Sequence, residues 1–332
     1  MGMYAHVTMA HRPLYTRRDF GALTLAGVPA ALLLNRIGLD AQMKGNSVVN
    51  GVHLGAITYS FRSIADANEI VKAYASIGLS EMEIMSNHVE ALAGTPAGPR
   101  GGGGRRGTPL TAEQQAERDA AQKAVADWRA SATEATFRPV RQKIWDAGIR
   151  LRLLCYNMNV RTTPDAEIDY AFVMAKGLGV EAISTSTQVS MAKRLAPFAD
   201  KHKIMVGFHG HADVTNPDEV AKPESFLAVM AESKYFGANL DIGHYTEAGY
   251  DPVTFLEQHH ARITNLHIKD KKKSTNGGGN TPWGQGDTPI KAVLKLVEKN
   301  KWDMPANIEF EYTGDPMVEM AKCLQYCKDA LA

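Results

Sequence analysis

Four apolar runs in the second half of the chain each end in side chains that could do chemistry. They carry, in chain order, His209 with His211, Asp241 with His244, His267 with Lys269 and Asp270, and Glu309 with Glu311. An isolated carboxylate or imidazole among apolar neighbours would be costly to desolvate. A divalent cation removes this cost, because imidazole nitrogens and carboxylate oxygens are its natural ligands. The pattern therefore favours a metal centre over a set of unrelated core side chains. One ligand from each of the four runs is expected.

The same strand ends supply candidates for proton transfer. Side chains alternate along a strand, so His211 shares a face with His209, and Glu311 shares one with Glu309. An imidazole in such a place, from His211 or from His244, could serve as a general acid or base. The catalytic groups that we expect are His211, His244, Lys269 and Glu311.

The elements that must position these residues alternate between strand-like and helix-like segments from about residue 50 onward. The expected strands are short apolar runs bounded by polar residues or glycine, at 53–62, 81–89, 150–160, 181–188, 204–213, 238–244, 264–270 and 306–312. Eight strands that alternate with helices predict an α/β fold, a (β/α)8 TIM barrel, with its active site where the carboxyl ends of the strands converge. No G-x-G-x-x-G follows the first strand, which weakens the alternative of a dinucleotide-binding, doubly wound sheet.

Helix starts are marked by capping residues. In the first helix, Ser63 is the expected cap, with Asp66 three residues on and Gly78 after the end. Five later helices are expected to begin where a capping side chain precedes a proline, which has no N–H to leave unsatisfied. These starts are Thr163-Pro164, Asn216-Pro217, Asp251-Pro252, Thr288-Pro289 and Asp315-Pro316.

Residues 91–130 interrupt this order as a helical insertion after the second strand of a single barrel at 50–332. The part at 91–109 is rich in Gly, Pro and Arg and predicts a mobile loop. Thr111 with Gln114 would then cap a long helix. In a barrel the insertion would emerge on the catalytic face, as a lid or as a subunit contact in a homo-oligomer. A solvated linker explains the glycine-rich part equally well.

Residues 1–45 are expected to be an export signal and linker. Arginines precede an apolar run at 20–34, which is the order of the charged and hydrophobic regions of a signal peptide. The run Thr-Arg-Arg-Asp-Phe at 16–20 resembles the twin-arginine signal. The apolar run is too short and too rich in glycine for a stable membrane span. These features favour a periplasmic or exported protein. A basic tail before a buried helix, in a cytoplasmic protein, is the alternative.

Composition narrows the function classes. The formal net charge of +1 does not indicate the basic surface with which proteins bind nucleic acid. The three cysteines, Cys155, Cys323 and Cys327, do not form the pattern of a disulfide framework, so we expect small core side chains. A length of 332 residues suits one large barrel.

The strand ends described first resemble the xylose-isomerase-like TIM-barrel family of sugar phosphate isomerases and epimerases, in a branch with a twin-arginine signal. The resemblance implies His209, Asp241, His267 and Glu309 as the metal ligands. The Asp-x-x-His motif of the family is similar to Asp241 with His244, its His-x-Lys-Asp run to residues 267–270, and its final ligand to Glu309. The first strand, at 55–61, is also similar to the opening strand of the family. The resemblance covers nearly all of the chain from residue 50, except the insertion. It implies one divalent ion, Mn²⁺ first, with Zn²⁺, Co²⁺ or Mg²⁺ as alternatives, and a small carbohydrate substrate.

One position departs from the family pattern. A Glu ligand usually ends the fifth strand, where this sequence has His209-Gly210-His211. Some branches, including ones that resemble inosose dehydratase, carry such an ending. An imidazole in place of the carboxylate lowers the negative charge around the ion by one and makes the ion a stronger Lewis acid. In the epimerases two Glu residues exchange protons with the substrate, and the absence of one here points to an imidazole instead.

Substrate-binding residues are expected on both sides of these motifs. Trp283, in a Trp-Gly-Gln-Gly-Asp run that resembles the substrate loop of the family, could stack on a sugar ring. An ordinary turn before the next helix explains its glycines equally well. Glu83 on the second strand and Asp270 are further candidates, whereas Lys271–Lys273 predicts a solvated run.

The leading functional hypothesis is a metal-dependent isomerase or epimerase of a sugar or keto-sugar, which removes a proton next to a chelated carbonyl. The alternative is a dehydratase or lyase with the same site, in which the carbanion expels a leaving group, as in inosose dehydration or 3-keto-glycoside elimination. A sugar-binding protein without catalysis is a third class. An endonuclease branch of the same barrel needs more metal ligands and a basic surface, which the charge balance disfavours.

Overall fold

The computed structural model describes residues 46–98 and 110–332. The expected export signal at 1–45 and residues 99–109 of the expected loop lie outside the described residues. Within the described part of the chain, no helix is long and apolar enough to cross a membrane.

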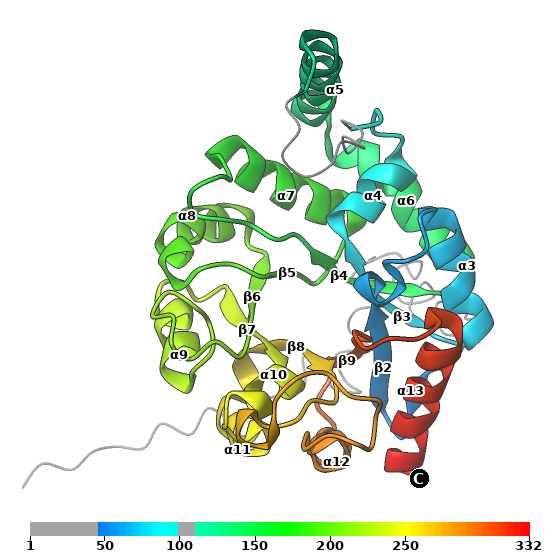
Figure 1. Cartoon of the computed structure of the whole chain (residues 1–332), viewed down its shortest axis with the longest axis vertical. Coiled ribbons are helices and arrows are strands. Elements are labelled where there is room, and N and C mark those ends of the chain that lie inside the picture. The colour runs from blue at the N-terminus through cyan, green and yellow to red at the C-terminus, as the bar shows by residue number, and fades with distance from the viewer. Residues whose placement is uncertain (1–45, 99–109) are drawn as a thin grey trace, which may run out of the picture. The chain divides into compact units, whose positions relative to one another are not determined.

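Eight parallel strands close into a ring, which Figure 1 shows from one end. β2 (Val52–Ile57) pairs with β3 (Glu81–Met85) on one side and with β9 (Pro305–Ile308) on the other. The strands between them are β4 (Arg150–Cys155), β5 (Ala182–Thr185), β6 (Met205–His209), β7 (Phe236–Asp241) and β8 (Ile263–Ile268). The pairing follows chain order throughout, so the predicted (β/α)8 TIM barrel is confirmed. A short β1 (Val48–Val49) adds an antiparallel pair with β2 that the sequence did not predict.

The strands end earlier than their sequence patterns predicted. The apolar pattern at 204–213 extends well past His209, where β6 ends, and the pattern at 306–312 extends past Ile308, where β9 ends. Beyond these points the chain turns into loops and short helices instead of continuing the ladder. As a result, His209 and Asp241 are the last residues of their strands and Glu309 is the first residue after its strand.

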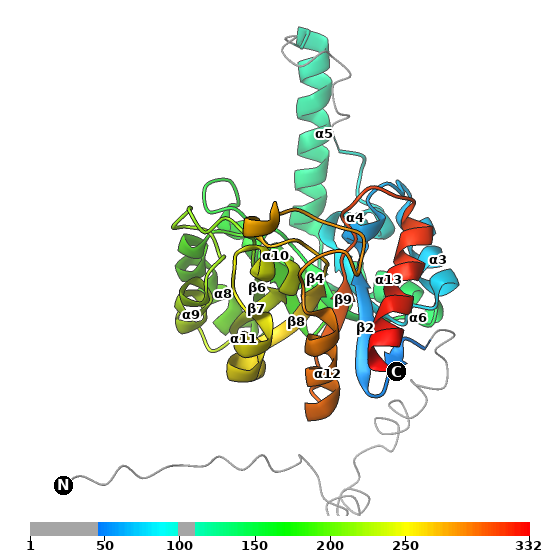
Figure 2. The same cartoon turned by 60° about the horizontal axis from the view of Figure 1, so that its bottom comes forward.

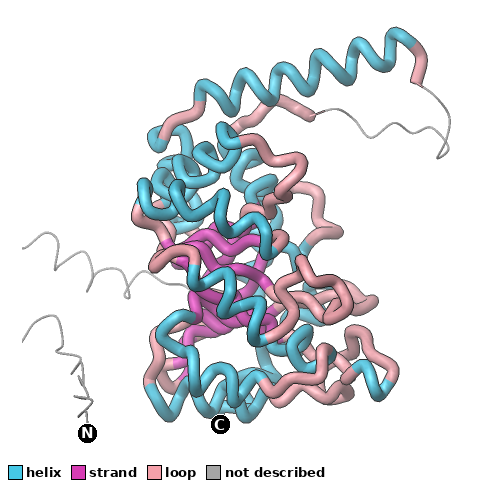
Figure 3. The backbone as a smooth tube through the Cα atoms, turned by 90° about the vertical axis from the view of Figure 1, so that its left-hand side faces the viewer, coloured by secondary structure: helices cyan, strands magenta, loops and turns pink. Residues whose placement is uncertain are grey.

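Helices surround the ring, as Figures 1 and 3 show. They are α3 (Ala67–Ile77), α4 (Ser86–Ala93), α5 (Ala112–Ser131), α6 (Glu134–Asp146), α7 (Asp165–Leu178), α8 (Ala192–His202), α9 (Pro223–Ala231), α10 (Ile242–Glu247), α11 (Pro252–His259), α12 (Ile290–Asn300) and α13 (Pro316–Leu331). The core lies between helices and strands. In α12, for example, Ile290, Val293 and Val297 form one buried stripe, and each such side chain stabilises the fold by about 1.5–3 kcal/mol. All three cysteines are buried in the core, as predicted.

Aspartates cap four of the described helices, including Asp241 at the start of α10. Asp251 and Asp315 accept backbone N–H groups at the starts of α11 and α13, with proline next in the chain, as predicted. In α3 the cap is Asp66 and not Ser63, so that prediction was wrong by three residues. Gly78 ends α3 with φ +87°, a left-handed conformation that glycine adopts without strain.

At two of the other three proline-marked positions a helix begins directly after the proline, but the expected cap was wrong, and at the third no helix starts. Thr163 accepts a hydrogen bond from the backbone N–H of Asn159 and does not cap α7. Thr288 likewise accepts the backbone N–H of Lys271, and α12 begins after Pro289 without a side-chain cap. At 216–217 no helix starts, and the loop continues to α9. In the two threonine cases, the side chain that would have capped the helix bonds a neighbouring loop instead.

α5 differs from the other helices, because none of its residues is buried. Thr111 and Gln114 form a reciprocal capping box at its start. Figures 1 and 2 show the helix extending away from the ring of helices. Its contact with the barrel is at its C-terminal end, where the Arg129 guanidinium lies 2.7 Å from Glu90 and 3.4 Å from Glu167.

An ion cluster lies near the amino ends of the strands. Arg152 is 1% exposed, and its guanidinium lies 2.7 Å from Glu181, 3.0 Å from Asp303 and 3.5 Å from Glu81. Glu81 is also 1% exposed. Because a buried carboxylate is costly without a cation, the Arg152 guanidinium offsets the cost of burying Glu81 here.

Candidate metal centre

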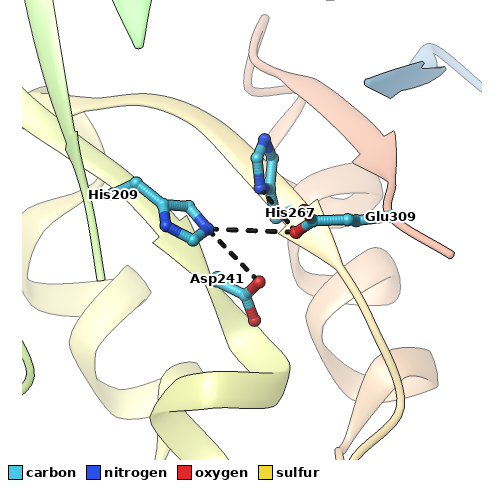
Figure 4. Close-up of side chains that lie close together, drawn as sticks. All are labelled: His209, Asp241, His267 and Glu309. Atoms are coloured by element: carbon cyan, nitrogen blue, oxygen red, sulfur yellow. Dashed lines mark hydrogen bonds and ion pairs between the residues drawn. The ribbon is translucent and has the colours of Figure 1, made fainter. Parts of the chain in front are cut away.

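Four side chains meet at the carboxyl ends of neighbouring strands. They are His209, Asp241, His267 and Glu309, the set expected from the sequence. One nitrogen or oxygen of each lies within 4.8 Å of the corresponding atoms of the other three. All four are buried, and Figure 4 shows them pointing toward one common centre. The last residues of β6 and β7, the penultimate residue of β8 and the residue after β9 thus supply the group.

The donor atoms fit a cation. His209 Nε2 lies 3.5 Å from Asp241 Oδ2 and 3.9 Å from Glu309 Oε2. His209 Nε2 is buried and has no hydrogen-bond partner within the described residues, and Asp241 Oδ2, also buried, makes no well-aligned hydrogen bond there although the Lys269 ammonium lies 3.2 Å away. Leaving such an atom unsatisfied costs about 1–3 kcal/mol. A cation would satisfy both atoms at once, so the group could bind a metal ion.

Lys269 lies beside the ligands. Its ammonium is 3.2 Å from Asp241 Oδ2, 3.0 Å from Glu309 Oε2 and 2.6 Å from Glu311 Oε2. Burial alone would lower the pKa of Lys269, but these carboxylates outweigh it and raise the pKa, so the side chain stays charged. This ammonium offsets the extra negative charge that Glu311 brings to the site.

His267 is held between two carboxylates. Its Nδ1 lies 3.0 Å from Glu309 Oε2 and its Nε2 lies 2.9 Å from Glu83 Oε2. Burial by itself would lower the pKa of His267, but Glu83 and Glu309 raise it well above its ordinary value. Glu83 is fully buried beneath the centre and does not line the cavity described next. This position does not suit the substrate-binding role that we expected for Glu83.

A cavity of about 450 Å³ opens above the four ligands. Its lining includes all four expected catalytic residues, His211, His244, Lys269 and Glu311. His244 follows β7 on α10, and its Nε2 lies 3.3 Å from the Lys269 ammonium. Burial lowers the pKa of His244 well below its ordinary value, which favours the neutral imidazole. His211 is more open, and its ring centroid lies 5.4 Å from that of His244.

Two expected substrate-binding residues lie outside this cavity lining. Asp270 is 3% exposed, and its carboxylate accepts the backbone N–H groups of Gly284 at 2.8 Å and Gly286 at 3.0 Å. Trp283 packs edge-on against Tyr326 of α13, with ring centroids 5.7 Å apart. Both residues therefore shape the loop after β8, and their positions do not support the sugar contact that we expected.

Lys271 and Asn280 are among the residues of the cavity lining that the sequence did not predict. Lys271 is 5% exposed and pairs with Glu247 at 2.8 Å, so its assignment to a solvated run was wrong. The signal was present, because the alternation that places Lys269 in the site continues to Lys271 two residues on. Asn280 also lines the cavity, beside Lys271 in an isolated bridge. The neighbouring sequence did not predict that Asn280 lines the cavity, because this residue lies on a long glycine-rich loop.

A larger cavity, of about 720 Å³, lies between α4, α5 and α7. Its charged groups Arg129, Glu90 and Glu167 are paired with one another, and none of the four metal ligands lines it. The chemistry of the molecule is therefore concentrated in the smaller cavity.

Comparisons with known proteins agree on the fold. Residues 183–329 match the family model described as xylose isomerase-like TIM barrel. No curated protein matches the sequence with significance. A solved structure described as a probable 3-DHS dehydratase, from Bacillus anthracis, aligns with a TM-score of 0.59 at 15% identity over 82% of this chain and 98% of that one. The apo form of 3-keto-D-glucoside 4-epimerase from E. coli aligns with a TM-score of 0.56 at 10% identity, over 84% and 99%.

A third structure, the IolI protein with a bound zinc atom, aligns with a TM-score of 0.55 at 12% identity, over 84% of this chain and 96% of that one. At these identities the likeness shows the fold, which is a TIM barrel of the xylose isomerase-like type. Proteins of this fold include a dehydratase and an epimerase by their descriptions.

Proposed function

We propose that this protein is a metal-dependent isomerase or epimerase that acts on a sugar or keto-sugar. The observation that carries the proposal is the convergence of four buried ligand side chains below a cavity whose walls hold acid–base groups. The epimerase and dehydratase with the same fold are consistent with this chemistry.

The ion would be held by His209, Asp241, Glu309 and the Nδ1 atom of His267. A divalent cation in that place supplies a Lewis acid for a substrate carbonyl and the negative charge that develops beside it. Mn²⁺ is the first candidate, and the two imidazoles also suit Zn²⁺ or Co²⁺, with Mg²⁺ as a further alternative. The zinc atom in a structure of the same fold supports a transition metal.

The proton would be moved by residues of the cavity wall. His211 is the base in this proposal, since its Nδ1 bonds Glu219 at 2.6 Å and its other nitrogen remains for the substrate. It removes a proton from the carbon next to the carbonyl, and the C–H electron pair moves toward the carbonyl oxygen. Lys269 donates a hydrogen bond to that oxygen, and protonated His211 returns a proton to the sugar to complete the rearrangement, while neutral His244 and the Glu311 carboxylate hydrogen-bond the substrate hydroxyl groups.

The charges in the cavity favour a neutral substrate. Lys269 is already paired with three carboxylates and Lys271 with Glu247. Neither ammonium is left to neutralise a phosphate, whereas a lysine–carboxylate pair can still donate to and accept from hydroxyl groups. Unphosphorylated sugars are therefore the first substrates to test.

The test is incubation of the metal-loaded protein in D₂O with a panel of ketoses and 3-keto-glucosides, followed by mass spectrometry and NMR of the sugar. We expect one deuterium at the carbon next to the carbonyl, together with an isomer or epimer. Chelated protein serves as the control. Loss of water or of an aglycone would instead assign the dehydratase or lyase. No exchange and no product across the panel would contradict both.

A further inference from the structure

We propose that Glu83 is a positioning residue, which holds the His267 ring so that Nδ1 faces the other metal ligands. The proposal rests on the metal-dependent function above, because it concerns how one ligand of that site is oriented. Glu83 itself lies beneath the cavity and outside its lining, so it acts through His267 and not on a substrate.

The geometry of the His267 ring carries the first step. Its two nitrogens face opposite ways, with Nε2 at 2.9 Å from Glu83 Oε2 and Nδ1 at 3.0 Å from Glu309 Oε2. A carboxylate that accepts the N–H of one ring nitrogen leaves the lone pair of the other nitrogen for a cation. Glu83 is on β3 and His267 on β8, so this contact crosses the interior of the barrel.

The second step is that Glu83 is itself fixed in place. The Asn265 amide donates to Glu83 Oε2 at 3.1 Å and the Asn307 amide donates at 2.7 Å, while the Ser184 hydroxyl donates to Oε1. These donors come from β5, β8 and β9, so side chains from three strands of the barrel hydrogen-bond one carboxylate. The oxygens therefore have almost no freedom to move away from the imidazole.

The third step concerns the free energy of burying the Glu83 carboxylate. Glu83 is 0% exposed, in the interior layer that branched apolar residues dominate in most barrels of this kind. A carboxylate and its polar partners there are no more stable than well-packed apolar side chains of the same volume. Fold stability alone thus gives no reason for Glu83, whereas orientation of a metal ligand does.

The experiment measures metal affinity by calorimetry, with Mn²⁺ and Zn²⁺ alone and no substrate. We expect Glu83→Ala to weaken binding of the tighter ion by about 10- to 100-fold, as for other partners of metal-bound histidines. Glu83→Gln should stay near the wild-type affinity. Its carbonyl oxygen can accept the same three donors at the Oε2 position, while its amide donates to the Ser184 hydroxyl.

Two controls separate positioning from stability. Ser184→Ala removes one hydrogen bond to the same carboxylate but leaves the contact between Glu83 and His267, so it should weaken binding much less than Glu83→Ala. In a His267→Ala background, Glu83→Ala should have no further effect on affinity, although it still lowers the melting temperature. If Glu83→Ala does not fold, Glu83→Asp withdraws the carboxylate by one methylene and should also weaken binding.

The proposal is overturned if a folded Glu83→Ala or Glu83→Asp variant binds the ion as tightly as the wild type. It is also overturned if Glu83→Ala weakens binding equally without His267. These outcomes differ from a failure of the proposed function, which would appear as wild-type protein that binds neither ion, or that binds an ion but turns over none of the keto-sugars.

Discussion

The Nδ1 atom of His211 lies 2.6 Å from the Oε1 atom of Glu219. A carboxylate behind an imidazole fixes which nitrogen carries the proton and holds the ring in one orientation. His211 lines the cavity, so the remaining nitrogen is available to a substrate. The two residues lie toward opposite ends of the loop after β6, where the backbone N–H of His211 also donates to the carbonyl of Val220, the residue after Glu219.

Replacement of His211 should remove proton transfer without removal of the metal. We expect His211→Asn to lower kcat by about 10²- to 10⁴-fold, the usual contribution of a general base. The metal content of the purified variant should equal that of the wild type. Glu219→Gln should lower kcat less, because the amide oxygen can still accept from Nδ1. Retention of wild-type kcat by His211→Asn would assign the base elsewhere.

Removal of the ion should destabilise the fold. A ligand that binds only the native state at 100 times its Kd stabilises that state by about 2.7 kcal/mol. Differential scanning calorimetry should therefore show a lower Tm in EDTA than in saturating Mn²⁺ or Zn²⁺. His209→Ala with Asp241→Ala serves as the control, and its Tm should not respond to the ion. The same Tm for wild-type protein in EDTA and in metal would argue against a bound ion.

Lys271 should contribute to substrate binding. One lost hydrogen bond to a charged group costs about 1.5–3 kcal/mol, so Lys271→Met should raise KM about 10-fold or more. We expect kcat to change little, because this contact is made equally in the ground state and the transition state. Steady-state kinetics on the best keto-sugar test this. Lys272→Met is the matched control, since Lys272 is exposed and should leave both constants unchanged.

Arg152 should be essential for stability and not for chemistry. Arg152→Met leaves the buried Glu81 without the nearby guanidinium, and loss of one partner of a buried pair typically costs about 3–5 kcal/mol. Urea denaturation measures this free energy of unfolding. In the control Arg150→Met, the lost pair is with Glu181 at 2.8 Å and is largely exposed, so we expect a cost of about 0–1 kcal/mol. Equal effects of the two variants would contradict the role of the cluster.

Asp169 should make stability depend on acid pH. Hydrogen bonds from Lys201, and then from His202, lower the pKa of Asp169 below its ordinary value of 3.8. A lowered pKa means that this stabilisation is complete above pH 3.8 and is lost as the pH falls through the folded-state pKa. The free energy of unfolding of the wild type should thus be larger than that of Asp169→Asn at pH 7. This difference should become smaller as the pH falls toward 3. Denaturation in EDTA checks this, and a constant difference across that range would refute it.

The barrel could be predicted from the sequence because its signal is local and repeated. Each strand is a short apolar run, and the alternation of side chains places Asp241 and His267 side by side on neighbouring parallel strands. The positions of the strand ends could not be predicted in this way. His211 and Glu311 continue the alternating pattern, but they lie in loops, where hydrogen bonds to distant residues such as Glu219 decide their placement.

Glu83 and Asp270 lie outside the cavity lining for a common physical reason. Glu83 is polar and on a strand, but only the three-dimensional arrangement shows that Asn265 and Asn307 enclose it below the site. Asp270 stands next to catalytic candidates in the sequence, yet its carboxylate accepts backbone N–H groups of its own loop. Sequence spacing predicts the face of a strand, and it does not predict which buried polar groups bond one another.

The pairing of β9 with β2 joins residues about 250 positions apart, such as Leu54 and Ala306. Contacts between residues so distant along the chain form late, because the entropy of closing a long loop is lost before these contacts stabilise the fold. Glu309 follows β9 directly, so a chain emerging from the ribosome carries three of the four ligands before the fourth can join them. Tight binding of the ion would therefore indicate that β9 has closed the barrel. A substitution that weakens the pairing of β9 with β2 should release the ion before the other strands separate.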